Sequence, residues 1–150
     1  HLDKRDKFEA MIHTRGMDAK VMERVFNLLQ ENIGSAQEIQ PVLTHSDFGP
    51  KHMMVDGEKI TGIIDWGGVT GHSPIHDFAG FKLWYPEIPF DAIQEGYSNK
   101  ELFNNDFERK LQWIALDNTF GALEWYDKNN YDAGIQYLLD KMREILEQTN

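Results

Sequence analysis

Residues 42–66, which read VLTHSDFGPKHMMVDGEKITGIIDW, constrain the fold more than any other part of the sequence. Two short apolar runs, at residues 53–55 and 60–64, lie on either side of Asp56 and Gly57. An Asp-Gly pair between apolar runs is a strong signal for a β-hairpin, because glycine supplies the positive φ that tight hairpin turns need. The sequence therefore predicts two antiparallel strands with a turn at Asp56-Gly57.

Polar residues lie at both open ends of this predicted hairpin. His52 precedes the first strand and Asp65 follows the second, so the hairpin should bring the two side chains together. Asp47, in a short loop before His52, is expected to join them. Two carboxylates and an imidazole at the rim of a small sheet suit an enzyme that holds a divalent cation beside a base. A single aspartate would more simply cap a turn, but the combined pattern favours a site.

This pattern resembles the catalytic segment of the aminoglycoside phosphotransferase and choline kinase-like family, which shares the protein kinase fold. The family motifs H-G-D-x4-N, I-D-W and P-x-x-D correspond here to His45-Ser46-Asp47-x4-His52, Ile64-Asp65-Trp66 and Pro74-Ile75-His76-Asp77. The resemblance covers roughly residues 40–80 and, more loosely, the helices that follow. Ser46 replaces the usual glycine, which we expect to be a mild change. His52 replaces the usual asparagine, as in aminoglycoside 2''- and macrolide phosphotransferases, and this favours an antibiotic kinase.

The resemblance implies a role for each polar residue of the segment, with Mg²⁺ as cofactor and ATP or GTP as co-substrate. Asp47 would orient the acceptor hydroxyl, and His45 would brace the catalytic loop. The remaining roles are metal binding by His52 and Asp65 and support of the loop by Asp77. Lys51 and Ile64 are candidate nucleotide contacts, although an exposed loop lysine is the simpler interpretation of Lys51. Asp77 could equally be a first-turn carboxylate favoured by a helix dipole, and the two roles can coexist.

Composition limits the class of protein and of partner. A chain of 150 residues can form one domain with a sizeable core. The net charge of −10 argues against a nucleic-acid partner, and it suits a polycationic acceptor, although it could equally serve solubility. The chain has no cysteine, no apolar run of membrane-spanning length and no signal-peptide pattern. We therefore expect a cytoplasmic protein that has neither a membrane-spanning segment nor disulfide bonds.

Apolar residues at helical spacing predict that helices make up most of the remaining chain. The expected fold is α+β and mainly α, the C-terminal helical lobe of a protein kinase-like fold with a small β-hairpin, as a single domain over residues 1–150. The expected helices cover residues 3–15, about 18–34 with Gly34 as the stop, 74–84, 90–98, a long one from Asn104 or Asn105, and a last one around residues 135–146. The glycine-rich segment 67–74 is expected to be a loop.

The far end of the long helix carries a candidate acceptor site. Carboxylates and aromatic rings alternate there, and together they could receive an amino sugar through ion pairs and stacking. The residues concerned are Asp117, Glu124, Trp125 and Tyr126. A solvated helix end explains the same residues without a ligand.

No residues match the N-terminal lobe of the family, with its β-sheet and its Lys-Glu pair. The chain starts within an expected helix, so we expect a fragment with little or no kinase activity alone. Two other classes stay open: a metal-dependent hydrolase with a closed cluster of His45, Asp47, His52 and Asp65, and a non-catalytic binding module. Within kinases, the acceptor could be an aminoglycoside, a macrolide, a small amine alcohol or a sugar.

Overall fold

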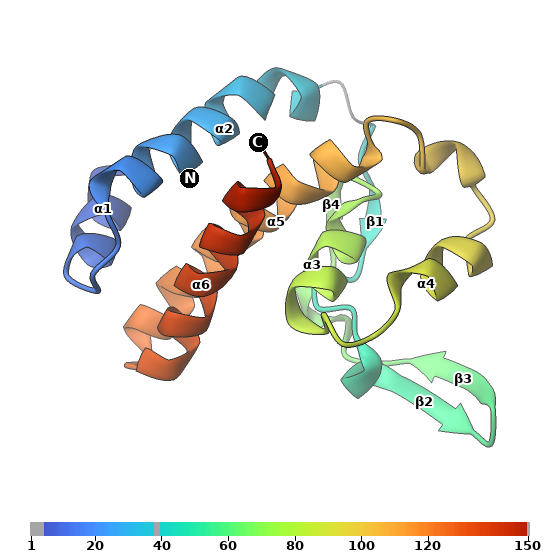
Figure 1. Ribbon diagram of the computed structural model, residues 1–150. Coiled ribbons are helices and arrows are strands. Elements are labelled where there is room, and N and C mark those ends of the chain that lie inside the picture. Colours follow the sequence, from blue (N-terminus) through green and yellow to red (C-terminus); the bar gives the residue numbers. More distant parts are fainter. Residues whose placement is uncertain (1–4, 38–39, 150) are drawn as a thin grey trace. The chain divides into compact units, whose positions relative to one another are not determined.

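The computed structural model describes residues 5–37 and 40–149, and within α2 the side chains are described as far as residue 34. The chain divides into two compact units, residues 1–38 with 112–150, and residues 39–111 (Figure 1). The first unit contains α1 (Arg5–His13), α2 (Ala19–Gln37), most of α5 (Phe107–Lys128) and α6 (Asp132–Gln148). The predicted class, α+β and mainly α, is confirmed. The single predicted domain stays a prediction.

The core of the helical unit is built from apolar residues spaced three and four apart. The ring of Phe120 in α5 lies 4.6 Å from that of Phe8 in α1 and 5.4 Å from that of Phe26 in α2. The apolar residues expected on the packed face of α6 are mostly buried. Ile145 is only half-buried, and the buried ones are Ile135, Leu138, Leu139, Met142 and Leu146. Each buried aliphatic or aromatic side chain stabilises such a core by roughly 1.5–3 kcal/mol.

Two glycines of this unit lie at or near helix ends expected from the sequence, Gly16 after residues 3–15 and Gly34 as the stop of the second helix. Gly16 lies at the end of the turn that follows α1 and adopts φ +81° there. Gly34 does not stop its helix, because α2 continues to Gln37. A glycine inside a helix costs only about 1 kcal/mol relative to alanine, and packing of the buried face outweighs that cost. Met22 and Phe26 are among the buried residues of α2, while Val21 is only half-buried.

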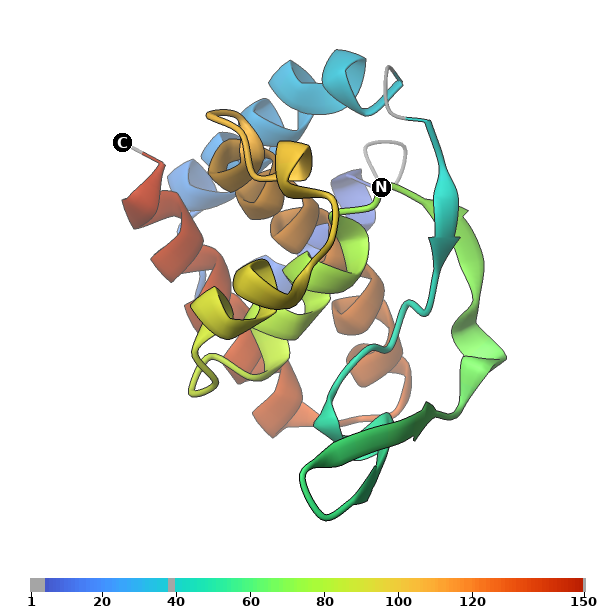
Figure 2. The ribbon, with the colours of Figure 1, turned by 90° about the vertical axis from the view of Figure 1, so that its right-hand side faces the viewer.

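The second unit carries two small antiparallel sheets. Strand β1 (Val42–Thr44) pairs with β4 (Thr70–His72), and β2 (Met53–Asp56) pairs with β3 (Lys59–Ile63), as Figure 2 shows. The β2–β3 hairpin was predicted, but its loop consists of Gly57 and Glu58, one residue later than expected. Gly57 has φ +58° at the first loop position, where type II′ turns need glycine.

The β1–β4 pair was not predicted. The glycine-rich segment taken for a loop contains the turn η3 (Trp66–Gly68) and then β4. A three-residue strand with one β-branched residue has no readable alternation, so only its pairing with β1 reveals it. The pairing matters because it holds the chain on both sides of the candidate site, directly before His45 and after η3.

Aromatic rings form the core of this unit around Phe78 of α3 (His76–Trp84). Its ring lies 5.1 Å from Tyr97, 5.9 Å from Phe90 and 5.9 Å from Phe103. The other short elements are η2 (Pro50–His52), α4 (Phe90–Gly96) and η4 (Lys100–Leu102). The long helix begins at Phe107 rather than at Asn104 or Asn105, because the side chain of Asn104 instead accepts the backbone N–H of Asp106 in the preceding turn.

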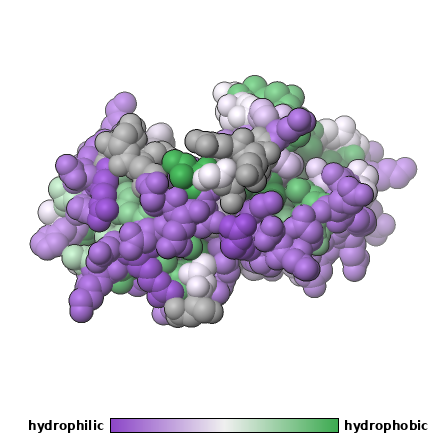
Figure 3. Space-filling model, turned by 90° about the horizontal axis from the view of Figure 1, so that it is seen from above, coloured by the Kyte–Doolittle hydropathy of each residue, from purple (hydrophilic) through white to green (hydrophobic). Residues whose placement is uncertain are grey.

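Hydrophilic residues cover most of the face shown in Figure 3, in keeping with the net charge of −10. Across the described part of the chain, no helix combines the length and the apolar character needed to cross a bilayer.

Candidate functional site

The loop that opens the polar segment is held by the carboxylate of Asp77, in the first turn of α3. Its Oδ2 accepts the backbone N–H of His45, and its Oδ1 accepts that of Ser46, both at 2.8 Å. Hydrogen bonds to an ionised acceptor are about twice as strong as those between neutral groups. A single carboxylate thus sets the direction of two consecutive peptide groups, while its place at a helix start also suits a negative charge.

His45 is buried, and both of its ring nitrogens are engaged. Nε2 lies 2.8 Å from the carbonyl oxygen of Ile64, and Nδ1 accepts the backbone N–H of Asp47 at 3.3 Å. A carbonyl can only accept and an amide can only donate, so the ring is neutral with its hydrogen on Nε2. His45 thereby ties the loop before Asp47 to the end of the hairpin before Asp65.

The hairpin brings His52 and Asp65 together, as predicted. The ladder extends one step beyond the strands, because the N–H of Ile64 donates to the carbonyl of His52 at 2.9 Å. His52 Nε2 then lies 3.4 Å from Asp65 Oδ2. On its other side, His52 Nδ1 donates to the backbone carbonyl of Asp47 at 2.9 Å and lies 3.8 Å from Asp47 Oδ2. The predicted convergence of the three side chains is confirmed.

The tautomer of His52 determines what its free nitrogen can do. Because Nδ1 donates to a carbonyl, the neutral ring carries only a lone pair on Nε2. That lone pair faces the carboxylate of Asp65, so two acceptors oppose each other across 3.4 Å. A proton or a metal cation between them would turn repulsion into attraction. The carboxylate oxygen of Asp65 is the type of ligand that Mg²⁺ prefers, whereas the imidazole nitrogen of His52 suits softer divalent metals better.

Asp47 is half-exposed, and its carboxylate is paired with Lys51. Lys51 Nζ donates to Asp47 Oδ2 at 2.9 Å, one turn further along the chain. This hydrogen bond raises the pKa of Lys51 above its usual value, so the ammonium stays charged throughout the neutral range. About half of each side chain is exposed to solvent, which leaves both groups accessible to a ligand.

Two residues of the site adopt a left-handed backbone. Ser46 has φ +67° and Asp65 has φ +62°. Aspartate is enriched there, but serine is uncommon, and glycine would adopt this conformation without strain. The family's glycine therefore has a backbone reason at position 46. Ser46 is held in this conformation by the hydrogen bond from its backbone N–H to Asp77 and by a 3.2 Å hydrogen bond between its hydroxyl and that of Thr44.

Trp66 is a further residue of the site that sequence reasoning did not single out beyond the motif. Its Nε1 donates to the carbonyl of Ile63 at 2.8 Å, and its ring centroid lies 4.8 Å from that of His45. The indole thus covers one side of the buried imidazole and fixes the chain directly after Asp65. Its place beside the aspartate was the available signal, but the partner ring lies 21 positions earlier.

The expected nucleotide residue Ile64 is 47% exposed. Its backbone is used on both sides, since its N–H donates to His52 and its carbonyl accepts from His45. The side chain thus presents apolar surface next to the polar cluster.

The four expected acceptor residues lie in the part of α5 that belongs to the helical unit. Successive positions of a helix point about 100° apart, so Glu124, Trp125 and Tyr126 do not share a face. Glu124 pairs with Lys7 at 2.7 Å, and Tyr126 packs against Tyr131 with ring centroids 5.1 Å apart. Trp125 is 59% exposed, and Asp117 is half-buried. Their acceptor role stays a prediction.

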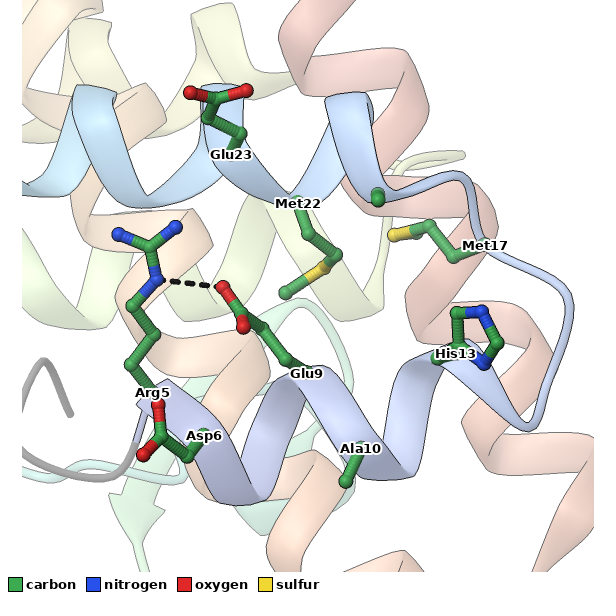
Figure 4. Close-up of a pocket in the computed structure, with 9 residues that line it drawn as sticks. Arg5, Asp6, Glu9, Ala10, His13, Met17, Met22 and Glu23 are labelled. Atoms are coloured by element: carbon green, nitrogen blue, oxygen red, sulfur yellow. Dashed lines mark hydrogen bonds and ion pairs between the residues drawn. The ribbon is translucent and has the colours of Figure 1, made fainter.

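A separate cavity of about 530 Å³ lies in the helical unit, between α1 and α2. Figure 4 shows Arg5 and Glu9 of α1 and Met22 of α2 directed into this space, with Arg5 and Glu9 joined by a 2.6 Å ion pair. Its lining also includes the carboxylates of Asp6 and Glu23 and the buried side chains of Met17 and Met22. None of the site residues predicted from the sequence lines this cavity.

The closed metal cluster of the hydrolase alternative finds no support in His45, whose two nitrogens are both committed to hydrogen bonds. Within residues 5–37 and 40–149, no three or more His, Asp or Glu side chains are gathered closely enough to hold a metal ion between them.

The chain matches known proteins both in its sequence and in its structure. A model of the phosphotransferase enzyme family matches residues 4–111. No curated protein sequence matches the chain. A thermostable mutant of aminoglycoside phosphotransferase APH(4)-Ia in its apo form is similar in structure, with a TM-score of 0.70, 18% identity, and coverage of 97% of this chain and 52% of that one.

Two ligand-bound structures are similar to the same degree. The ternary complex of the APH(4)-Ia mutant with ADP and hygromycin B has a TM-score of 0.71 and 16% identity, covering 97% of this chain and 50% of that one. The GDP complex of aminoglycoside 2'-phosphotransferase-IIIa has a TM-score of 0.68 and 16% identity, covering 99% and 50%. The chain thus spans about half the length of these proteins and shares their kinase-like fold. Since the family model covers more than half of its residues, the chain belongs to the phosphotransferase enzyme family.

Proposed function

We propose that the whole protein transfers the γ-phosphate of ATP or GTP to a hydroxyl of a small, cationic acceptor such as an aminoglycoside. The observation that carries this proposal is the position of His52, whose imidazole lies 3.8 Å from the carboxylate of Asp47 and 3.4 Å from that of Asp65. A base and a pair of metal ligands within reach of one another are the minimum that metal-assisted phosphoryl transfer needs from this lobe.

Asp47 acts as the base in this proposal. Its half-exposed carboxylate accepts a hydrogen bond from the acceptor hydroxyl and directs the oxygen towards the phosphate. Because phosphoryl transfer is loose, positioning matters more than early removal of the proton, which Asp47 takes late. Asp77 and His45 keep the peptide groups before Asp47 in place through their hydrogen bonds.

His52 and Asp65 would hold Mg²⁺, through the lone pair on Nε2 and the exposed carboxylate. The chemistry that the ion would supply there is positive charge, which offsets the negative charge of the nucleotide phosphates during transfer. Lys51, whose ammonium donates to Asp47, would add a second positive charge for a phosphate oxygen. The exposed side chain of Ile64 offers apolar surface to the nucleotide base.

A cationic acceptor is supported by charge and by the similar structures. The chain has a net charge of −10, which would attract a polycation over a distance, and one similar structure contains hygromycin B. Asp117, Glu124, Trp125 and Tyr126 are the proposed acceptor contacts. An antibiotic-modifying role in the cytoplasm follows as part of the same proposal. Since the chain covers half of the similar proteins, we expect little activity from these 150 residues alone.

The base assignment is tested with Asp47→Asn in the whole protein. We expect kcat to fall by about 10³-fold or more, since the amide neither takes a proton nor pairs with Lys51 in the same way, while nucleotide affinity stays within a few-fold. Steady-state kinetics and nucleotide titration measure the two quantities. A large loss of nucleotide affinity with little loss of kcat would contradict the role of Asp47 as base.

The metal assignment is tested with Asp65→Ala, and Asp56→Ala at the far end of the same hairpin is its matched control. We expect Asp65→Ala to abolish Mg²⁺-dependent nucleotide binding and Asp56→Ala to leave it unchanged. Isothermal titration with Mg²⁺ in the presence and absence of nucleotide also separates the classes. Tight metal binding without nucleotide would favour the hydrolase instead.

A further inference from the structure

In the sequence, Gly49 lies between Asp47, the proposed base, and His52, the proposed metal ligand. An aromatic ring covers it. The residue is buried, and a Cβ added to it would lie 2.6 Å from both Cζ and Oη of Tyr85 and closer still to Cε2. The tip of the phenol ring therefore rests directly on the Cα of Gly49. Any larger residue at position 49 has to displace either the ring or the loop.

The peptide groups beside Gly49 lead directly to the metal ligand. The carbonyl of Gly49 accepts the backbone N–H of His52 at 3.0 Å, which closes the turn η2. The position of Gly49 thus sets where the His52 ring begins. Asp47 lies two residues before Gly49, so a shift of this glycine moves both groups relative to each other.

Tyr85 is well placed to hold this glycine, because its own position is fixed from α3. Its N–H donates to the carbonyl of Phe81 at 2.9 Å at the end of the helix, and its ring centroid lies 5.4 Å from that of Phe81. Phe48, next to Gly49, lies 5.9 Å from the same Phe81 ring. The helix end and the loop therefore share one packed aromatic surface.

We propose that Tyr85 is a positioning residue, whose ring presses on Gly49 and so fixes the separation between Asp47 and His52. The ring contacts the backbone of Gly49, and its effect on the site would pass through that backbone. Its consequence for catalysis rests on the phosphotransferase function proposed above. Its consequence for the loop does not, because it follows from the contact with Gly49 alone.

The contact is tested by hydrogen exchange of the peptide that covers residues 46–54 in the whole protein. Tyr85→Ala removes the ring, and Gly49→Ala forces a methyl group against it, so we expect both to increase exchange in this peptide at least several-fold. Tyr85→Phe keeps the ring and should behave as the unaltered protein. Tyr97→Ala removes a half-buried ring from the same unit away from Gly49, and it controls for general destabilisation.

The double variant Gly49→Ala/Tyr85→Ala separates a direct contact from two independent effects. With the ring gone, the added methyl group no longer collides, so the double variant should exchange no faster than Tyr85→Ala. Effects that simply add, or a peptide that exchanges at the same rate in every variant, would overturn the proposal.

Kinetics then test whether the contact positions the site. A displacement of about 1 Å at a reacting group can cost about 100-fold in rate, so kcat should fall by ~10–100-fold in Gly49→Ala and Tyr85→Ala. The KM for nucleotide should change much less than kcat in these two variants. Tyr85→Phe should keep the kcat of the unaltered protein. Faster exchange with unchanged kcat would overturn the positioning role. If the unaltered protein transfers no phosphate, the proposed function fails, while the exchange results still decide whether Tyr85 holds Gly49.

Discussion

Asp77 offers the sharpest test of how the site is built, because two explanations of the residue differ in energy. Each carboxylate oxygen accepts one backbone N–H at 2.8 Å, from His45 and Ser46. Hydrogen bonds to a charged group contribute roughly 1.5–3 kcal/mol each. In Asp77→Asn one oxygen can still accept, in a neutral bond worth about 1 kcal/mol, while the new amide N–H₂ group faces the second backbone N–H. Because the residue is half-buried, we expect a loss of about 2–4 kcal/mol in the free energy of unfolding.

A helix-dipole role alone predicts a much smaller number. Asp91 is an exposed carboxylate in the first turn of α4, so Asp91→Asn measures the loss of a favourable charge at a helix start. That contribution is about 0.3–1 kcal/mol. Urea unfolding of both variants, followed by circular dichroism, gives the two free energies. The amide hydrogens of His45 and Ser46 should also exchange faster in Asp77→Asn and not in Asp91→Asn.

Equal losses of stability in the two variants would contradict a structural role for the double hydrogen bond. If Asp77→Asn and Asp91→Asn lower the free energy of unfolding by the same amount within about 0.5 kcal/mol, the double hydrogen bond contributes no net stability. Asp77 would then be only a helix first-turn carboxylate.

Two further predictions concern the core and the ion pair. Phe120→Ala should lower the free energy of unfolding by about 3–5 kcal/mol, because this fully buried ring packs on two other helices. Trp125→Ala removes an exposed aromatic side chain of the same helix and should lower it by less than about 1 kcal/mol. Similar losses for the two variants in urea unfolding would contradict the packing of Phe120. Lys51→Met should cost only about 0.2–1 kcal/mol at neutral pH, since the pair with Asp47 is half-exposed. The pKa of Lys51 is raised by its hydrogen bond to Asp47 above the usual 10.5, so this stabilisation is present below the usual pKa and lost as pH rises through the raised pKa. Thermal unfolding on both sides of that range should show the difference disappear, and a difference that persists at high pH would contradict the ion pair.

The hairpin and its polar ends could be predicted because their signals are local. The positive φ of Gly57 and the apolar runs on each side specify the turn, and the turn brings His52 to Asp65 whatever the rest of the chain does. The amphipathic stripe of α6 is local in the same sense. The end of α2 could not be predicted from Gly34, because packing outweighs the small helix penalty of one glycine.

The contacts that shape the site join residues that are far apart in the sequence. The bond from Asp77 to the loop spans 32 positions, and Tyr85 rests on Gly49 across a similar distance along the chain. The resemblance assigned Asp77 to support of the loop, but neither contact leaves a periodic pattern, and the left-handed backbone of Ser46 is visible only in coordinates. The β1–β4 pair is hidden for the same reason, since each strand is too short to carry a signal of its own.

The sequence by itself determined which side chains can do chemistry and that a hairpin would bring two of them together. Only the tertiary structure decided the tautomers of the two histidines, the pairing of Asp47 with Lys51 and the surfaces that hold the loop. The physical reason is that a turn is specified by the conformational preferences of a few adjacent residues. The protonation and position of a side chain depend instead on whichever distant donors, acceptors and rings the fold places against it.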